Sequence, residues 1–297
     1  MFPRAFHYHR ARSLKEAAGM LADLGEEAKL LAGGQSLIPL MKLRFANPKH
    51  LVDLNFIPKL SYIKAKKDEL RFGALTRHSD IENSAAAAKI PIIHDCAAGI
   101  ADVQIRNRGT IGGSLAEADP SGDWAVVLST LETTVRCSGR QGERAIALKD
   151  FITDAYSTVL GKDEVVSEVL VKVPPKGSGS AYIAFKRSAP VYPTASAAVH
   201  LVIEGDTCME AAIALGCVGL IPIQASEAAA ALRGRPVNDK TINAAAEAAR
   251  AAADPQPDMR GSAEYKRTLV AALVKRAINA ALGRARGERV EVTHLYA

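Results

Sequence analysis

Two glycine pairs, each followed closely by a serine, are the residues of this chain best suited to bind an anion. They lie in Ala32-Gly33-Gly34-Gln35-Ser36 and in Thr110-Ile111-Gly112-Gly113-Ser114. A glycine pair tolerates positive φ and carries no side chain, so successive backbone N–H groups can converge on one anion. An isolated pair more often marks an ordinary tight turn. Two pairs with hydroxyl groups beside them favour a pyrophosphate held between the two segments.

Common nucleotide-binding and hydrolytic motifs are missing from the sequence. There is no G-x-G-x-x-G after a predicted strand and no G-x-x-x-x-G-K-[ST], so neither a Rossmann site nor a P-loop is indicated. The histidines form no H-E-x-x-H, and we interpret His7-x-His9 as a surface coincidence. No G-x-S-x-G elbow marks a serine hydrolase. If the glycine pairs bind a nucleotide, the site therefore belongs to neither the Rossmann nor the P-loop class.

The segment that carries the first glycine pair is predicted to open with a helix. Ser13 and Glu16 form a capping-box pattern ahead of apolar residues at helical spacing, and Gly25 ends the helix. A short strand over 29–32 leads into the glycine pair, and an apolar stretch over 51–54 closes the segment.

The second glycine pair lies in a segment of mixed α+β pattern, which a Pro- and Gly-rich linker over 174–180 separates from a third segment. We predict strands at 70–74, 133–137 and 165–173 and helices at 80–88 and 92–101 in the second segment. In the third we predict strands at 182–187, 195–203 and 209–217, then three alanine-rich helices. The last helix, capped by Ser262, should bury a stripe from Leu269 to Leu282 and leave Lys266, Arg267, Lys275 and Arg276 in solvent.

Composition narrows the class of protein. The chain has 297 residues, enough for two or three domains, and a formal net charge of +6. Its basic residues are scattered and aromatic residues make up only 5%, so we expect no nucleic-acid site. The four cysteines lack metal-ligand spacing, which predicts neither disulfide, zinc nor iron–sulfur cluster. No apolar run approaches the ~20 residues of a membrane span, and we expect a cytoplasmic protein.

Three runs of residues together resemble a known family. The first is Leu31-Ala32-Gly33-Gly34-Gln35-Ser36-Leu37-Ile38-Pro39-Leu40-Met41-Lys42-Leu43-Arg44. The second runs from Val103-Gln104-Ile105-Arg106-Asn107-Arg108-Gly109 through the second glycine pair to Asp119-Pro120 and Asp123. The third is Asp258-Met259-Arg260-Gly261-Ser262-Ala263-Glu264-Tyr265-Lys266-Arg267. Their order over essentially the whole chain resembles the FAD-binding medium subunit of molybdenum hydroxylases, the carbon monoxide dehydrogenase and xanthine dehydrogenase family.

The resemblance implies a fold and a division of the chain. The fold class would be α+β, with a two-part FAD-binding domain of the vanillyl-alcohol-oxidase-like (PCMH) type. Residues 1–57 and 58–175 would form its two subdomains. Residues 176–297 would form a C-terminal domain with a small antiparallel sheet and helices.

The resemblance also implies which residues bind FAD. They are Lys29 and Leu31 on the entry strand, Ala32, Gly33, Gly34, Gln35 and Ser36 in the first loop, Thr110, Ile111, Gly112, Gly113 and Ser114 in the second, and Asp123, Lys186 and Tyr192. Both loops would hold the pyrophosphate, Ile111 would lie against the flavin, and Asp123 would lie near the ribityl and adenosine portion. Lys186 would stabilise negative charge at the pyrimidine edge. Tyr192 would cover the other flavin face.

Alternatives for single residues stay open. Lys186 could be a solvated strand lysine, and Tyr192 could be ordinary packing. The chain also departs from the family pattern. Ala189-Pro190-Val191 replaces a glycine and an acidic residue, and Ser114 stands where many relatives have asparagine.

Finally, the resemblance implies a role in electron transfer. Electrons would arrive from a small iron–sulfur subunit, after substrate oxidation on a large molybdopterin subunit, and leave to NAD, a quinone or oxygen. The assembly would be a dimer of heterotrimers, and this chain would carry no catalytic or metal-ligating residue of its own. A stand-alone FAD-dependent oxidoreductase of the same fold is the alternative, and a nucleotide-binding assembly subunit is the non-enzymatic one.

Overall fold

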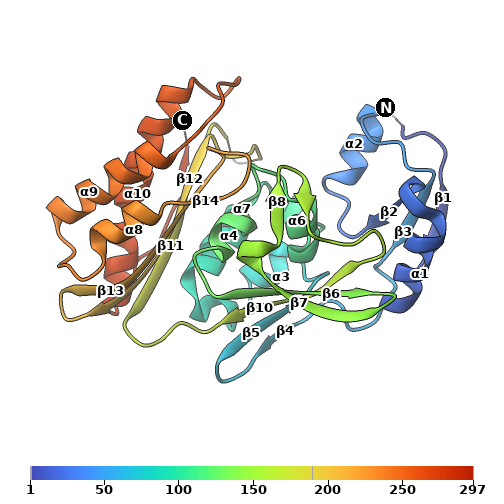
Figure 1. Cartoon of the computed structure of the whole chain (residues 1–297), viewed down its shortest axis with the longest axis horizontal. Coiled ribbons are helices and arrows are strands. Elements are labelled where there is room, and N and C mark those ends of the chain that lie inside the picture. Colours follow the sequence, from blue (N-terminus) through green and yellow to red (C-terminus); the bar gives the residue numbers. More distant parts are fainter. Residues whose placement is uncertain (1, 189, 297) are drawn as a thin grey trace.

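The computed structural model describes residues 2–188 and 190–296, and within them the fold is α+β, as predicted (Figure 1). Three successive parts of the chain each build their own sheet. In Figure 1 the N-terminal part (blue) lies at one end of the molecule and the C-terminal part (orange to red) at the other. Of the departure from the family pattern at 189–191, residue 189 lies outside the described residues.

The N-terminal part is a three-stranded parallel sheet with helices between its strands. Its elements are β1 (His7–Arg10), α1 (Leu14–Leu24), a 3₁₀ turn (Gly25–Glu27), β2 (Ala28–Leu31), α2 (Leu37–Leu43) and β3 (His50–Asp53). The strand β3 lies between β1 and β2. Ser13 caps α1 by accepting a bond from the Glu16 N–H, and Gly25 ends it at φ 60°. The Glu16 carboxylate accepts from the Arg12 N–H, so the reciprocal bond of the predicted box is shifted by one residue.

The middle part is a five-stranded antiparallel sheet covered by short helices. In chain order its elements are β4 (Ile63–Ala65), β5 (Glu69–Gly73), α3 (His78–Glu82), a 3₁₀ turn (Ala87–Lys89), α4 (Pro91–Gly99), α5 (Val103–Arg106), α6 (Ile111–Glu117), α7 (Asp123–Leu128), β6 (Thr133–Gly139), β7 (Gly142–Ala147), a 3₁₀ turn (Leu148–Asp150), β8 (Ile152–Asp154), β9 (Ser157–Thr158) and β10 (Val165–Lys172). The sheet order is β4-β5-β10-β6-β7. The helix predicted at 80–88 is wrong in extent, because α3 ends at Glu82 and only a 3₁₀ turn follows.

The C-terminal part pairs a second five-stranded sheet with three helices on one side (Figure 1). Its elements are β11 (Ser178–Lys186), β12 (Ala195–Glu204), β13 (Thr207–Gly216), β14 (Ile223–Gln224), α8 (Ser226–Leu232), α9 (Asp239–Ala252), α10 (Ala263–Ala285) and β15 (Leu295–Tyr296). The predicted linker is wrong beyond residue 177, since Ser178 begins β11. Gly179 is required in this strand because a Cβ there would collide with the backbone of α10 at Ala281 and Ala285.

The stripe predicted on the last helix is buried, but one residue was assigned to the wrong side. Val270, Leu273, Val274 and Ile278 lie in the C-terminal core. Lys266, expected in solvent, is only 3% exposed. Its ammonium donates to the Gln256 carbonyl at 2.8 Å and pairs with Asp258 at 3.0 Å, because the segment before α10 folds back over the helix start.

A buried ion pair joins the middle and C-terminal parts. Arg284 of α10 donates two bonds to Asp95 of α4, at 2.6 and 2.9 Å, and a third to the Ser180 carbonyl of β11 at 2.7 Å. The helix α4 also packs against β11. Across the part of the chain described, no helix has the length and apolar character needed to cross a membrane.

Candidate functional site

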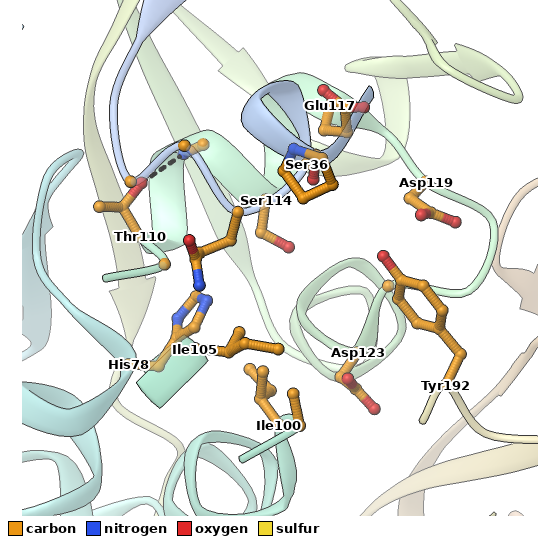
Figure 2. Close-up of a pocket in the computed structure, with 18 of the residues that line it drawn as sticks. Ser36, His78, Ile100, Ile105, Thr110, Ser114, Glu117, Asp119, Asp123 and Tyr192 are labelled. Carbon is orange, nitrogen blue, oxygen red and sulfur yellow. Dashed lines mark hydrogen bonds between the residues drawn. The ribbon is translucent and has the colours of Figure 1, made fainter. Parts of the chain in front are cut away.

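A pocket of about 720 Å³ lies where the three parts meet (Figure 2). Its lining comes from all three. The residues are Leu30, Ala32, Gly33, Gly34, Gln35, Ser36, Leu37, Pro39, Leu40, His78, Ile100, Ala101, Ile105, Gly109, Thr110, Gly113, Ser114, Glu117, Asp119, Gly122, Asp123, Tyr156, Lys186, Pro190, Val191, Tyr192 and Pro193. Segments far apart in sequence therefore contribute to one concave site, as is usual for a cofactor pocket.

The first glycine loop connects the end of β2 to the start of α2 and presents free backbone donors. Gly34 has φ 74°, which favours glycine. Within residues 2–188 and 190–296, the N–H groups of Gly33, Gly34, Gln35 and Ser36 have no protein acceptor. Backbone donors beside a pocket are seldom left without a partner, so this loop is suited to an anionic group.

The second glycine pair is a helix start, which corrects the interpretation of this segment as a turn. Thr110 is the N-cap of α6, and its hydroxyl accepts from the Gly113 N–H at 3.1 Å (Figure 2). The Gly112 N–H donates to the Ala74 carbonyl at 3.0 Å, and the Ser114 N–H donates to the Thr110 carbonyl at 3.0 Å. In the described residues the second loop leaves only the Thr110 N–H without a protein acceptor, so the predicted cluster of free donors is confined to the first loop. The second loop contributes this single donor, the Ser114 side chain and Gly113 to the pocket lining.

Close contacts with neighbouring segments explain why positions 33 and 112 are glycine. A Cβ on Gly33 would collide with the Arg108 carbonyl, so the two loops touch directly at this point. A Cβ on Gly112 would lie 2.6 to 2.8 Å from Ala74 atoms at the end of β5. Gly33 thus brings the loops together at the pocket, whereas Gly112 packs α6 onto the sheet.

Most, but not all, of the residues predicted to contact FAD line the pocket. Those that do are Ala32, Gly33, Gly34, Gln35, Ser36, Thr110, Gly113, Ser114, Asp123, Lys186 and Tyr192. Those that do not are Lys29, Leu31, Ile111 and Gly112. Lys29 is exposed on β2, and Leu31 packs beside Gly34. Ile111, expected against the flavin, is instead completely buried in the main core.

Lys186 and Asp123 lie in the protein interior at the floor of the pocket. Lys186 is 1% exposed, which excludes the solvated alternative, and its ammonium donates to the Gly99 carbonyl. Among the residues that the structure describes, no carboxylate pairs with it. Asp123 accepts a 2.5 Å hydrogen bond from the Tyr182 hydroxyl. A buried ammonium without a counter-ion favours a ligand that becomes negative beside it.

Tyr192 lies at the mouth of the pocket and is 46% exposed. In Figure 2 its hydroxyl points toward Asp119. Burial, and next the Asp119 carboxylate, raise the pKa of this phenol. The Arg260 guanidinium lies 5.8 Å from the ring centroid. The Tyr192 side chain thus lies between the Asp119 carboxylate and the Arg260 guanidinium. Its ring lines the pocket and is not part of the core.

His78 is the most informative pocket residue that the sequence did not predict. It is 5% exposed, and burial, assisted by the Arg77 and Arg106 charges, lowers its pKa to about 3. The imidazole is therefore neutral at physiological pH. Glu117, Asp119 and Tyr156 were also missed as lining residues. No short motif marks these positions, because they converge only when α3, α6 and β9 pack together.

The fold and this pocket define a flavin-binding protein of two domains. Residues 4–175 match the family described as "FAD binding domain in molybdopterin dehydrogenase", and residues 180–281 match "CO dehydrogenase flavoprotein C-terminal domain". The chain belongs to the family of FAD-binding medium subunits of molybdenum hydroxylases, so it is an oxidoreductase subunit and its cofactor is FAD, as predicted.

Individual relatives extend over nearly the whole chain. The chain is similar to the carbon monoxide dehydrogenase medium chain of Afipia carboxidovorans, with 39% identity over 96% of this chain and 100% of that protein. It is 38% identical to the 6-hydroxypseudooxynicotine dehydrogenase complex subunit alpha of Paenarthrobacter nicotinovorans, over 99% of this chain and 100% of that one.

Solved structures agree with this assignment. A chain of carbon monoxide dehydrogenase from Hydrogenophaga pseudoflava superimposes with a TM-score of 0.93 at 40% identity, covering 96% of this chain and 99% of that one. A chain of quinoline 2-oxidoreductase from Pseudomonas putida 86 gives a TM-score of 0.91 at 34% identity, covering 96% and 99%.

Proposed function

We propose that this chain receives electrons from iron–sulfur clusters of a partner subunit and passes them to an external acceptor. The partners are a small iron–sulfur subunit and a large molybdopterin subunit, in a cytoplasmic dimer of heterotrimers. Full-length similarity to medium chains of such enzymes supports this assignment. FAD supplies the matching chemistry when bound, because a flavin can accept electrons singly and release them as a pair.

The observation that carries the proposal is the buried Lys186 ammonium at the floor of the pocket, which forms no ion pair with any described residue. The first loop of the same pocket has backbone N–H groups without an acceptor in the described part of the chain. Residues 33–36, with the Ser114 hydroxyl, hold the pyrophosphate. Lys186 stabilises negative charge at the pyrimidine edge of the ring, and Tyr192 covers one ring face. Asp123 binds hydroxyl groups of the ribityl or adenosine portion. Ile111 and Gly112 support α6 from behind and do not contact FAD.

The division into subdomains 1–57 and 58–175 and a C-terminal domain 176–297 belongs to the same proposal. Its support is that each range builds a separate sheet. The FAD pocket then lies between the parts, where bound cofactor adds contacts to all three.

Reduction kinetics of the purified chain test the function. Alone, the chain should be reduced slowly by carbon monoxide, aldehydes or heteroaromatic compounds, because substrate oxidation takes place on another subunit. Co-expression with the large and small partner subunits proposed above should restore fast reduction by the substrate of that complex. Fast bleaching of the flavin by any of these compounds without partner subunits would instead establish the stand-alone oxidoreductase.

A further inference from the structure

We propose that Asn55 and Arg77, outside the pocket, are positioning residues that hold its two glycine loops together and orient the first loop for phosphate binding. This inference rests on the proposed FAD site. Neither residue belongs to a recognised motif of the sequence, and neither lines the pocket.

The two side chains form a continuous link from one loop to the other. The Asn55 amide nitrogen donates to the Ala32 carbonyl of the first loop at 2.9 Å. One Arg77 nitrogen donates to the Asn55 amide oxygen at 2.5 Å, and another donates to the Arg108 carbonyl, just before the second loop. This carbonyl is the atom that a Cβ on Gly33 would strike. The link therefore closes at the place where the loops touch.

The bond to Ala32 determines where the Gly33 N–H points. In a planar trans peptide the C=O and the following N–H point in opposite directions. Asn55 does not line the pocket, whereas Gly33 does, so we infer that the bond to Asn55 directs the Ala32 carbonyl away from the pocket and the Gly33 N–H toward it. Gly33 is one of the loop residues whose N–H has no protein acceptor in the described part of the chain. The link thus preorganises a donor that would otherwise be free to rotate.

Asp53 fixes the orientation of the Asn55 amide. Its Oδ1 accepts from the Asn55 backbone N–H at 2.8 Å and from the Asn55 side-chain nitrogen at 2.6 Å. Its Oδ2 accepts from the Tyr8 hydroxyl at 2.5 Å. A flipped amide would place its oxygen against this carboxylate and its NH₂ against Arg77. Both hydrogens of the amide and its oxygen are used, which only asparagine at this position provides.

Arg77 adds a charge as well as two bonds. Burial, and next the nearby Arg108, lower the pKa of its guanidinium. Within the described residues no carboxylate forms an ion pair with Arg77, and its side-chain partners are neutral oxygens. The Asp80 and Asp53 carboxylates act on this charge only from beyond ion-pair distance, so a positive charge that contacts both loop links can still attract a pyrophosphate.

Binding of FAD to the cofactor-free full chain, followed by quenching of flavin fluorescence, tests the role of the pair. Arg77→Met should weaken FAD binding by roughly tenfold to a hundredfold, the effect of one or two lost charge-assisted bonds. Asn55→Ala removes the donor to Ala32 and the acceptor for Arg77 without adding a charge beside Asp53, and should weaken binding by roughly tenfold. Arg77→Lys retains the charge and one bond, and should rescue part of the loss.

Matched control variants distinguish a loss of FAD affinity caused by misplaced loops from one caused by a destabilised fold. Arg144 donates to the Val159 carbonyl at 2.7 Å and pairs with Glu164, and Asn83 donates to the Ser79 carbonyl at 2.8 Å, both outside the pocket lining. Arg144→Met and Asn83→Ala should leave FAD affinity unchanged. Asn55 is exposed and Arg77 half-buried, so the melting temperature of the cofactor-free Asn55 and Arg77 variants should stay near that of the controls.

The outcomes are distinct. Weaker FAD binding in Arg77→Met and Asn55→Ala, with control-like melting of the cofactor-free protein and partial rescue by Arg77→Lys, supports the inference. Wild-type affinity in these two variants, or losses that only follow their melting temperatures, overturns it while leaving the FAD site intact. A wild-type chain that binds no FAD, alone or co-expressed with its partner subunits, overturns the proposed site together with this inference.

Discussion

The indole nitrogen of Trp124 donates a 3.1 Å hydrogen bond to Nδ1 of His78, and both side chains are buried. Because Nδ1 accepts, the proton of the neutral imidazole lies on Nε2. A Cβ on Gly109 would lie 2.6 Å from this Nε2, so the ring packs against the residue just before the second loop. A core tryptophan therefore sets the tautomer of a histidine that lines the proposed FAD pocket.

Replacing His78 with glutamine should make the stability of the cofactor-free protein less sensitive to acid. The folded-state pKa of His78, about 3, lies below the unfolded value of about 6.5. Below pH 6.5 the unfolded chain takes up a proton that the folded chain refuses, so stability present above pH 6.5 is lost as the pH falls toward 3. Between pH 7 and 5 this histidine accounts for about 2 kcal/mol.

Urea unfolding of wild type and His78→Gln at both pH values measures this difference. His200 and His294, whose pKa values burial also lowers, contribute an acid sensitivity that both proteins share. Parallel losses of stability in the two proteins would show that His78 is protonated normally and that its burial has no such consequence.

The sequence predicts helices and strands well where capping residues or apolar periodicity mark them. It predicts them poorly where only tertiary packing determines the structure. The helix after Ser13 and the stripe on the last helix follow from capping and periodicity. The edge strand β7 is mostly exposed, and its apolar residues cluster at its end instead of alternating with polar ones, so no strand pattern predicts it. Lys266 was placed in solvent because helical spacing carries no information about a separate segment folding over the helix start.

Pocket residues could be predicted where a short sequence pattern determines the local backbone, as in the first glycine loop. Residues that reach the pocket region only through tertiary contacts could not be predicted. The first loop could be predicted because its glycine pair and serine follow a strand and recur in a second segment, whereas one such pair alone more often marks a tight turn. The same reasoning is wrong for Gly112, because the Thr110 cap starts helix α6 there although glycine disfavours helices. Asn55 and Arg77 have ordinary sequence neighbours, and only the folded chain brings them to the loop carbonyls.

The two glycine pairs should respond differently to valine. Gly33→Val pushes the loops apart at the pocket and should abolish FAD binding while much of the fold persists. Gly112→Val forces a branched side chain into Ala74, so it should also destabilise the cofactor-free protein by about 1–3 kcal/mol. Flavin content and urea unfolding of each variant measure the two effects.

Gly19→Val provides the comparison, because nothing lies within 4 Å of a Cβ at that position. It should retain flavin and keep at least the wild-type stability, because valine is less unfavourable than glycine in a helix interior such as that of α1. Full flavin content in Gly33→Val would contradict the assignment of the first loop, and equal stability of Gly112→Val and Gly19→Val would contradict the packing role of Gly112.

Removing the Lys186 charge should lower the reduction potential of the bound flavin. Methionine fills a similar volume but cannot favour a negatively charged reduced ring. A hydrogen bond to a charged group contributes on the order of 1–3 kcal/mol, and ~1.4 kcal/mol corresponds to about 30 mV for a two-electron couple. Redox titration should therefore give a potential lower by tens of millivolts.

Lys266→Met is the matched control for this titration. Lys266 is equally buried and pairs with Asp258, but it does not line the pocket. Its replacement should destabilise the fold and leave the potential unchanged. An unchanged potential in Lys186→Met, or an equal shift in both variants, would mean that Lys186 does not act at the flavin.

Substitutions of Tyr192 should change access of oxygen to the flavin more than its potential. If the ring covers one flavin face, Tyr192→Ala exposes that face and should speed reoxidation of the dithionite-reduced protein in air-saturated buffer. Tyr192→Phe keeps the ring but removes the hydroxyl that faces Asp119, so it should reoxidise at a rate between the wild type and the alanine variant. Asp119→Asn weakens the same contact from the other side and should resemble Tyr192→Phe.

Stopped-flow absorbance measures the reoxidation rates of the wild type and these three variants. A Tyr192→Ala variant that reoxidises no faster than wild type would show that the ring packs at the pocket mouth without covering the flavin.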